Sequence, residues 1–318
     1  MTIVAPDKVA KIARPAGRLR RFIDSDMLHS FVRSPLVMFA ALIAVILVGA
    51  AFLAPVLAPH DPYDLKSLNL MDGENPPRWI KGGDPRFWLG TDDQGRDIYS
   101  TILYGMRSSL LIAMAAVGFA LLLGVSLGLV AGYRGGRIDT LIMRIADIQL
   151  TFPSILTALL VDGIARTALK GSQLGNSHYV ILVVAIGLSF WVQYARTVRG
   201  VTLVERNKDY VQAARLIGLS SRKIMFNHVL PNVLSPVLVL ATINLALAII
   251  TEATLSFLGV GLPSSEPSLG TMIQIGNRFL LSGSWWMVAF PGVTLAALVL
   301  AVNLVGDWLR DKLDPRLR

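Results

Sequence analysis

Residues 36–57 read LVMFAALIAVILVGAAFLAPVL, and this stretch contains no charged residue. A helix needs about 20 mostly apolar residues to cross the roughly 30 Å hydrocarbon core of a bilayer, since each residue adds about 1.5 Å. The stretch is too long, and starts too far into the chain, for the apolar core of a cleavable signal peptide. We therefore predict that residues 36–57 form the first transmembrane helix and that the amino terminus stays attached.

The composition of the whole chain agrees with a membrane protein. Of its 318 residues 53% are hydrophobic and 16% are charged, whereas a soluble domain has about 25% charged residues. Further apolar stretches follow the first, which gives six predicted transmembrane helices: residues 36–57, 108–132, 148–169, 179–195, 232–258 and 285–306. The predicted fold class is an all-α integral membrane protein.

The positions of Lys and Arg predict the orientation of these helices. Alternate segments contain 21 basic residues against 8, the richer set being 1–35, 133–147, 196–231 and 307–318, and the poorer set 58–107, 170–178 and 259–284. Basic residues collect in cytoplasmic loops. Both termini are therefore expected in the cytoplasm. The net charge of +9 then reflects topology and not nucleic-acid binding.

The same reasoning divides the chain into regions. We expect a cytoplasmic segment 1–35, the first helix 36–57, an extracytoplasmic segment 58–107, a core of five helices over 108–306, and a cytoplasmic tail 307–318. No region contains a G-x-x-x-x-G-K-[ST] nucleotide loop, a cysteine, or two histidines at helical metal-ligand spacing. The sequence thus predicts no catalytic residue, no metal site and no cofactor bound by this chain.

Few ionisable residues lie inside the predicted spans, where burying a charge costs at least about 2.5–3.5 kcal/mol. Asp162 and Arg166 are four residues apart, so we expect an ion pair on one helix face. Glu252 has no such neighbour, and it is either part of a translocation path or an interfacial carboxylate. The candidate path residues are Asn244, Thr251, Glu252 and Thr254. Such sparse charge argues against a proton-driven carrier and indicates that energy enters elsewhere.

The loop over residues 196–232 is longer than a connection between two spans requires. A helical pattern in it ends at Gly218, where a left-handed residue can terminate a helix. Ser220 can cap a second helix over 222–230, which Pro231 would close. The pattern predicts a helix, a turn and a helix. A DNA-binding helix-turn-helix and an amphipathic segment lying on anionic lipid are the alternatives.

Within this loop, residues 209–218 (DYVQAARLIG) and the following Val229-Leu230-Pro231-Asn232 resemble the EAA motif of binding-protein-dependent ABC importer permeases. The usual first Glu is Gln212 here, so no role that needs a carboxylate is carried over. Residues 89–97 (LGTDDQGRD), 255–261 (LSFLGVG) and 303–315 (NLVGDWLRDKLDP) are similar to the C-type subunit of the dipeptide/oligopeptide/nickel permeases. The resemblance covers nearly everything after residue 30.

The resemblance implies a type I permease fold and a function as the membrane subunit of an ATP-driven importer of dipeptides, oligopeptides or related small solutes. It also implies a place in the cytoplasmic (inner) membrane of a bacterial or archaeal cell. The implied partners are a second homologous permease, two cytoplasmic ATPase subunits that bind ATP and Mg, an extracytoplasmic solute-binding protein and the lipid bilayer, with no nucleic acid. Loop 196–232 would be the coupling helix that docks on an ATPase. Its candidate residues are Asp209, Tyr210, Gln212, Ala213, Ala214, Gly218, Leu219, Ser220 and Pro231.

Individual roles follow from the residue types. The two alanines and Gly218 would allow close approach and a turn, Tyr210 and Leu219 apolar contact, and Pro231 a break before the fifth span. The candidate contacts with the binding protein are Gly90, Asp92, Gly95, Arg96 and Asp97, unless this stretch is a structural elbow that enters the second span. The rival functions are a secondary carrier or channel, and a membrane-tethered DNA-binding protein.

Overall fold

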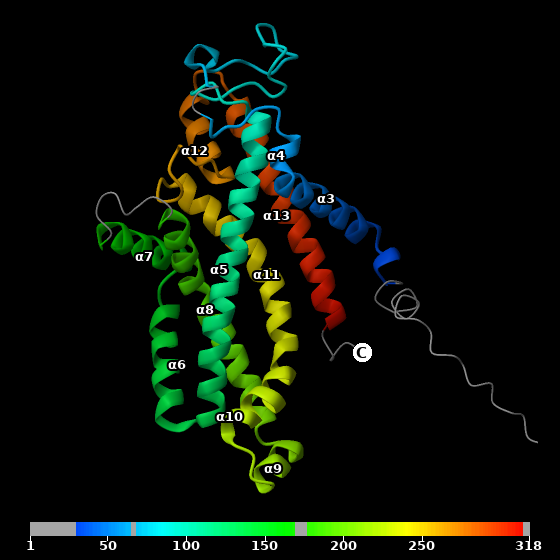
Figure 1. Ribbon diagram of the computed structural model, residues 1–318, viewed down its shortest axis with the longest axis vertical. Coiled ribbons are helices and arrows are strands. Elements are labelled where there is room, and N and C mark those ends of the chain that lie inside the picture. Colours follow the sequence, from blue (N-terminus) through cyan, green and yellow to red (C-terminus); the bar gives the residue numbers. More distant parts are fainter. Residues whose placement is uncertain (1–29, 65–67, 169–176, 314–318) are drawn as a thin grey trace, which may run out of the picture. The chain divides into compact units, whose positions relative to one another are not determined.

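A computed structural model describes residues 30–64, 68–168 and 177–313 (Figure 1). The chain divides into two units, residues 1–39 and 40–318, and the helices described below belong to the second unit apart from the start of the first helix. The described residues form helices and connecting segments with one isolated β-bridge and no strand. The predicted all-α fold is confirmed. Residues 1–29 of the expected amino-terminal segment and 314–318 of the expected tail lie outside the described residues.

Five of the described helices are long and apolar enough to cross a membrane. They are α3 (Pro35–Phe52), α5 (Ile98–Arg134), α8 (Ser177–Glu205), α11 (Leu230–Phe257) and α13 (Trp286–Leu313). The shorter elements are α4 (Ala54–Leu57), η1 (Leu70–Asp72), α6 (Gly136–Leu150), α7 (Ser154–Ala168), α9 (Asp209–Leu216), α10 (Ser221–Ile224), the π-helical turn η3 (Met225–Val229) and α12 (Leu269–Phe279). A sixth span exists if α6 and α7 together count as one.

The predicted continuous span over 148–169 is wrong. Helices α6 and α7 meet at an angle of 99°, and the break lies at Phe152-Pro153. Proline has no N–H to donate and disfavours the helical conformation of the residue before it. The apolar run is therefore divided between two differently directed helices.

Other helix boundaries also differ from the predicted ones. The stretch 36–57 is interrupted at Leu53, and Pro55 lies in the first turn of α4. Helix α5 begins at Ile98, ten residues before the predicted start, and its 37 residues span about 55 Å. That length exceeds the roughly 30 Å hydrocarbon core, so α5 connects the membrane region with the segments beyond it.

Helices α5 and α8 form the most extensive helix pair among the described residues. A row of glycines spaced four apart, Gly124, Gly128 and Gly132, lies on α5 at this contact. A Cβ atom on Gly128 would lie 2.4 Å from the carbonyl oxygen of Ala195 on α8, and one on Gly124 would lie 2.5 Å from that of Trp191. Small residues at this spacing let two membrane helices approach closely.

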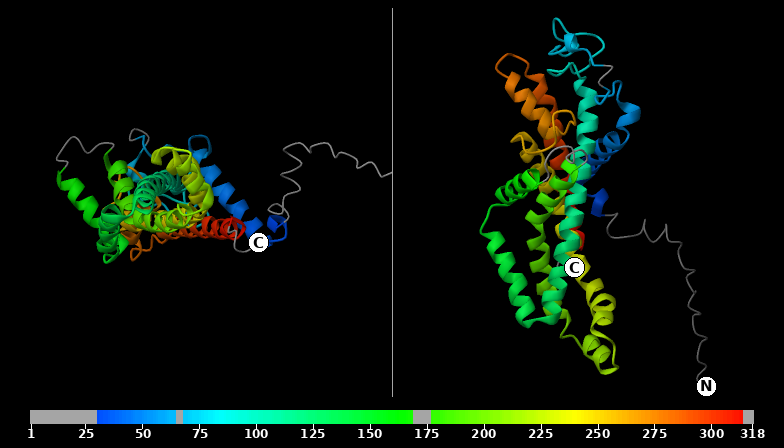
Figure 2. Two further views of the ribbon diagram at one scale, coloured as in Figure 1. Left: turned by 90° about the horizontal axis from the view of Figure 1, so that it is seen from below. Right: turned by 60° about the vertical axis from the view of Figure 1, so that its left-hand side comes forward.

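The sequence did not predict α12, which lies in the segment expected to be a loop. Ser268 and Thr271 form a capping box at its start, in which each side chain accepts a hydrogen bond from the other's backbone N–H. The helix packs against α11 and α13. It marks one end of the helix bundle, here called the α12 end, and the segment with α9 and α10 marks the opposite end, the α9 end (Figures 1 and 2).

Candidate functional site

The α9 end is built from two short helices and a tight turn. Helix α9 ends in a Schellman motif, in which the Leu219 N–H donates to the Ala214 carbonyl at 3.1 Å and the Gly218 N–H to the Arg215 carbonyl at 3.0 Å. Gly218 has φ +79°, which L residues with a side chain rarely adopt. The Ser220 hydroxyl then accepts the Lys223 N–H at 3.4 Å and caps α10. The predicted helix, turn and helix are confirmed.

The predicted helix end at Pro231 is wrong. Helix α10 continues through the π-helical turn η3 into α11, and Pro231 lies in the first turn of α11. Proline inside a regular helix would clash with the carbonyl four residues earlier. The wider turn, in which the Leu230 N–H donates to the Met225 carbonyl, accommodates the ring. The second short helix is therefore a direct extension of a membrane-spanning helix.

The surface of α9 and its turn is unusually apolar for an exposed loop. Leu216 is 88% exposed and Ile217 is 76% exposed, and they follow the exposed Ala213. Ala214, by contrast, is 5% exposed and packs into the chain's own core, so the expectation that it faces a partner is not met. An exposed apolar cluster of this kind, consisting of Ala213, Leu216 and Ile217, is typical of a protein–protein contact. Leu216 and Ile217 were missing from the candidate residues.

The remaining coupling candidates surround this cluster. Asp209 lies in the first turn of α9. Gln212, Gly218 and Ser220 are exposed and Leu219 is half-buried. Together with the apolar cluster they form the exposed side of residues 209–220, whereas Val211 and Ala214 pack into the core.

A hydrogen-bonded network ties α9 to two spanning helices. Glu205, at the end of α8, accepts a hydrogen bond from the Tyr210 hydroxyl at 2.6 Å and one from the Lys208 ammonium at 2.6 Å. The Asn232 amide on α11 donates to the Tyr210 hydroxyl at 2.9 Å and to the His228 carbonyl at 2.9 Å. Burial, followed by the nearby Glu205 carboxylate, raises the pKa of Tyr210. Tyr210 is thus a polar junction, and not only the apolar contact that was predicted.

Glu205 and Asn232 were missed in the candidate list although both lie in or beside the loop 196–232. Glu205 is 7% exposed, which its charge does not suggest. Its position five residues before Tyr210, on the far side of a short turn, is the one local signal, because the two side chains are then close enough to form the hydrogen bond observed.

Three arginines connect the α9 end to α5, to α6 and to the turn between these two helices. Arg206 donates to the Gly132 carbonyl at 2.8 Å. Arg199 makes a two-pronged ion pair with Asp139, one of its hydrogen bonds being 2.7 Å long, and such bidentate contacts are strong and directional. The guanidinium of Arg215 lies 5.6 Å from the centre of the Tyr133 ring. The α9 end is therefore connected to α5, α6, α8 and α11.

The four candidate path residues do not share one open surface. Asn244 is 1% exposed, Glu252 is fully buried and Thr251 is 6% exposed. One carboxylate oxygen of Glu252 accepts the Ser256 hydroxyl at 2.8 Å. Thr254 is half-buried and donates to the Ile250 carbonyl at 2.7 Å. Within this chain Glu252 therefore faces neighbouring helices and not a water-filled opening.

The predicted ion pair of Asp162 and Arg166 is confirmed, with 2.6 Å between Nε and Oδ2. The same guanidinium donates to the carbonyls of Val260 and Gly261 at 2.8 and 2.7 Å. The pair thus joins α7 to the segment that follows α11 at the α12 end.

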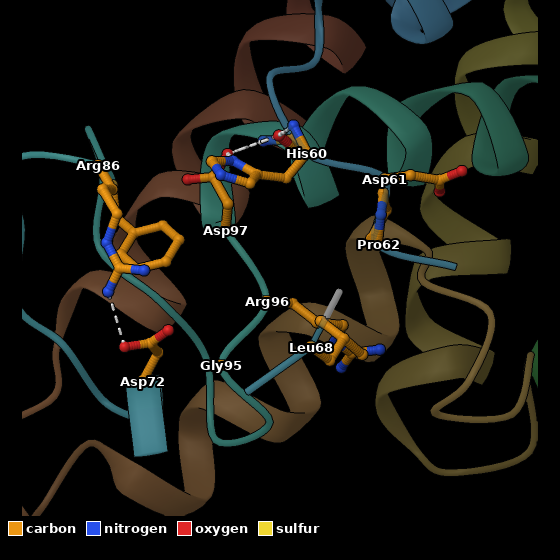
Figure 3. A pocket seen from close by; sticks show the side chains of 11 residues that line it. His60, Asp61, Pro62, Leu68, Asp72, Arg86, Gly95, Arg96 and Asp97 are labelled. Atoms are coloured by element: carbon orange, nitrogen blue, oxygen red, sulfur yellow. Dashed lines mark hydrogen bonds and ion pairs between the residues drawn. The ribbon is translucent and has the colours of Figure 1, made fainter. Parts of the chain in front are cut away.

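The five candidate contacts for a binding protein lie in a buried elbow that leads into α5. Figure 3 labels Gly95, Arg96 and Asp97 of this set. Arg96 is 3% exposed, pairs with Asp92 at 2.6 Å and donates to the Ser264 carbonyl at 2.7 Å. Asp97 is 4% exposed and caps α5 by accepting the Ser100 N–H at 2.9 Å. Gly90 and Gly95 are buried as well. These residues form the structural elbow, and their side chains are not offered at the surface.

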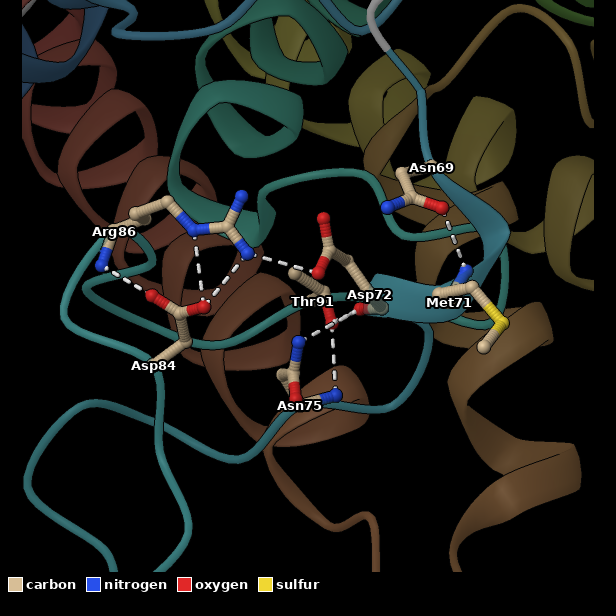
Figure 4. Close-up of polar contacts among 7 residues, drawn as sticks. All are labelled: Asn69, Met71, Asp72, Asn75, Asp84, Arg86 and Thr91. Carbon is tan, nitrogen blue, oxygen red and sulfur yellow. Dashed lines mark hydrogen bonds and ion pairs between the residues drawn. The ribbon is translucent and has the colours of Figure 1, made fainter.

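Polar contacts link residues within the segment 69–91, which leads into the elbow (Figure 4). Arg86 bridges Asp84 at 2.7 Å and Asp72 at 2.9 Å. The Arg86 hydrogen bonds lower the pKa of the Asp84 carboxyl. The Thr91 hydroxyl donates to the Asp72 carbonyl at 2.6 Å and accepts the Asn75 N–H at 2.8 Å. A small cavity of about 120 Å³ remains beside the elbow, with His60 and Asp97 among its lining residues.

Two family models match this chain, and curated proteins from bacteria are similar to it over most of their length. A family model described as the binding-protein-dependent transport system inner membrane component matches residues 124–318, and one for the N-terminal transmembrane domain of oligopeptide transport permease C matches residues 25–77. The di/tripeptide transport system permease protein of Pseudomonas aeruginosa is 40% identical over 91% of each chain. The oligopeptide transport system permease protein of Bacillus subtilis is 36% identical over 92% of this chain and 90% of its own.

The fold also matches a solved structure. A chain from an inward-facing structure of the MetNI methionine ABC transporter superposes with a TM-score of 0.53 at 20% identity, covering 67% of this chain and 96% of that one. The predicted permease fold is thereby confirmed.

Proposed function

The chain belongs to the family of binding-protein-dependent transport system inner membrane components, and we propose that it is one of the two permease subunits of an ATP-driven importer of dipeptides or oligopeptides. Relatives whose names specify di/tripeptide, dipeptide and oligopeptide transport share 36–40% identity with it over most of both chains. As a multi-pass protein of the inner membrane it would form half of the translocation path, with a second homologous permease forming the other half.

The observation that carries the coupling role is the exposed apolar cluster of Ala213, Leu216 and Ile217 at the tip of the α9 end. An ATPase subunit with a matching groove would bury it. The ATPases would bind ATP and Mg, and this chain would bind neither. The α9 end then faces the cytoplasm and both termini lie there, as the distribution of Lys and Arg predicts.

The hydrogen-bonded network around Glu205 would transmit a movement of the ATPase to the spanning helices. Helix α10 continues into α11 without a break, and Tyr210 bonds to Glu205 on α8 and to Asn232 on α11. A displacement of α9 by the ATPase would therefore move the two spanning helices together as a rigid body. Rocking of these helices would open the path between the two permeases first to one side and then to the other.

The α12 end would receive the solute-binding protein. Since the five candidate residues within 90–97 are buried, we expect the contact to involve exposed parts of the segment 58–89 and not the elbow itself. The two rival functions are less well supported. A recognition helix that enters a DNA groove is difficult to form from α10, which has four residues and continues into a spanning helix.

A reconstitution experiment tests the proposal against a secondary carrier. Proteoliposomes with both permeases and both ATPases should import a labelled dipeptide when the binding protein and ATP are present. Vesicles that contain this chain alone should accumulate nothing under a proton gradient. Accumulation in those vesicles would contradict the proposal.

A further inference from the structure

The segment between α4 and α5 carries large apolar side chains that the chain itself does not cover. Trp79 is 63% exposed and Trp88 is 59% exposed. Both border one shallow hollow of about 400 Å³, whose lining also includes Arg78 and Leu89. Exposed apolar patches mark contacts with a partner or a membrane. The proposed coupling role leaves this patch unexplained, since it lies on the segment that leads to the α12 end.

Its position relative to α13 indicates what covers it. The Trp79 ring lies 6.0 Å from the ring of Phe290, and the Trp285 ring lies 5.8 Å from the same ring. Phe290 is four residues inside α13, which starts at Trp286, so it lies about 6 Å along the helix axis. Trp79 is therefore level with the first turn of a spanning helix.

The patch adjoins the spanning helix α13, which carries further exposed apolar side chains. Val293 and Leu300 on α13 are 69% and 60% exposed, and their spacing of seven residues puts them on one helix face. Trp285 is 42% exposed at the start of the same helix. Exposed side chains on α13 are aliphatic at Leu300 and Val293, whereas those around its start, Trp285 and Trp79, are aromatic. Aromatic residues are enriched where a membrane helix passes from the hydrocarbon core into the interface.

Two basic side chains near the tryptophans could bind the phosphate of a lipid headgroup. Arg78 and Lys81 are exposed beside the tryptophans, and among the described residues no carboxylate forms an ion pair with either. Their aliphatic stems can lie along an apolar surface while the charged ends reach phosphate groups. This combination fits a phospholipid headgroup better than a protein partner, which would need to match an apolar patch that extends directly into the lipid-facing side of α13.

We propose that Trp79, Trp88 and Trp285 bind phospholipid in the headgroup region at the α12 end and anchor the segment 78–89 there. The anchored segment directly precedes the elbow, because residues 90–97 follow it and lead into α5. It fixes the height at which α5 enters the bilayer. The inference is independent of the transported solute.

The absence of cysteine from the sequence allows a direct depth measurement. Trp79→Cys is labelled with an environment-sensitive fluorophore in the assembled importer, in vesicles of phosphatidylethanolamine and phosphatidylglycerol that carry a headgroup-proximal nitroxide lipid. Met71→Cys is the matched control, because Met71 is 90% exposed on the same segment and lies in η1. We expect the label at position 79 to be quenched several-fold more than the label at 71.

Other outcomes overturn the proposal. Equal quenching at both positions, or quenching of position 79 by a water-soluble nitroxide alone, would show that the patch is in water. Shielding of position 79 only after addition of the binding protein would assign the patch to that partner. Crosslinking of position 79 to the second permease would assign it to that subunit.

A second measurement keeps the native side chains in place. Brominated phospholipids should quench part of the tryptophan fluorescence of the wild-type importer, and replacing Trp79, Trp88 and Trp285 together by phenylalanine should lower the part that headgroup-proximal bromine quenches. Trp286→Phe is the control, since Trp286 is 7% exposed and its indole N–H donates to the Thr91 carbonyl at 3.2 Å. An equal loss from both changes would contradict the anchor.

Discussion

Replacement of Gly218 by valine tests whether the turn after α9 sets the geometry of coupling. Gly218 has φ +79°, and a Cβ added to it would meet no atom within 4 Å. The cost of a side chain is therefore confined to the backbone. For an L residue in the left-handed region this cost is about 1–2 kcal/mol, and a β-branched residue is at the upper end. About 1.4 kcal/mol corresponds to a tenfold change in an equilibrium, so the native turn becomes about 5–30-fold less favourable.

The effect should be local. The Schellman hydrogen bonds of Leu219 and Gly218 weaken, while α8 and α11 keep their packing. We expect Gly218→Val to assemble normally and to hydrolyse ATP, with less dipeptide imported per ATP. Asparagine tolerates the left-handed conformation better than other residues with a side chain, so Gly218→Asn should lose much less. Gly200→Ala is the control, because Gly200 also has open space around it but lies within α8.

The assay measures dipeptide uptake and ATP hydrolysis in the same proteoliposomes. The ratio of the two should fall in the order wild type, Gly218→Asn, Gly218→Val, with Gly200→Ala equal to wild type. The reasoning is refuted if the valine variant imports normally, or if asparagine and valine reduce the ratio equally, since conformational strain would not then be the cause.

Three further predictions concern packing, the junction and acidity. Gly128→Leu should remove the folded chain from the membrane fraction, because its Cβ position lies 2.4 Å from a backbone oxygen of α8; Gly118→Leu, with nothing within 4 Å, should accumulate normally, and equal amounts on an immunoblot would contradict the tight contact. Tyr210→Phe removes the hydroxyl that bonds to Glu205 and Asn232, which costs about 1–2 kcal/mol for a partly exposed group, and it should lower import per ATP several-fold while ATP hydrolysis continues; unchanged coupling would argue against the junction. Asp84 has a pKa lowered from 3.8 by Arg86, so its stabilising contribution is present above the ordinary pKa and is lost as pH falls through the lowered one. Limited proteolysis of segment 78–90 should increase only at that acidic pH, and Asp84→Asn should be cleaved faster at neutral pH; an acid response identical in both proteins would contradict this assignment.

The spanning helices and the turn at Gly218 could be predicted because their signals are local. An uncharged apolar run of sufficient length has few alternatives to a membrane helix, and a glycine after a helical pattern is suited to a left-handed terminator. These features depend on the chain's own composition and conformational preferences more than on contacts with distant residues.

The effects of proline could not be predicted, because they depend on packing. Pro153 lies where α6 and α7 diverge by 99°, whereas Pro231 is accommodated by a π-helical turn and the helix continues. Both prolines remove a hydrogen-bond donor. Which result follows depends on whether neighbouring helices hold the two sides in line, and a local sequence pattern does not contain that information.

Burial of polar residues was the second source of error. Arg96 and Asp92 look like surface residues in a hydrophilic stretch, yet each satisfies the other in a buried ion pair. Glu205 likewise gains its role from the Tyr210 hydroxyl, which donates to it and in turn accepts a hydrogen bond from the Asn232 amide on α11. The charge partners are close in sequence, but the burial depends on packing against distant residues, such as Ser264, whose carbonyl accepts a hydrogen bond from Arg96; single segments do not contain that information.

Site-directed crosslinking to an ATPase subunit tests the central claim most directly. Ala213→Cys and Ile217→Cys place thiols on the exposed surface of the α9 end, and Ala214→Cys, at a position 5% exposed, is the matched control one residue away from Ala213. With a cysteine in the groove of the co-expressed ATPase, the two exposed positions should crosslink in a yield that changes with ATP, and position 214 should not. The absence of crosslinks at every position from 212 to 220, or equal yields at 213 and 214, would contradict a coupling contact at this surface.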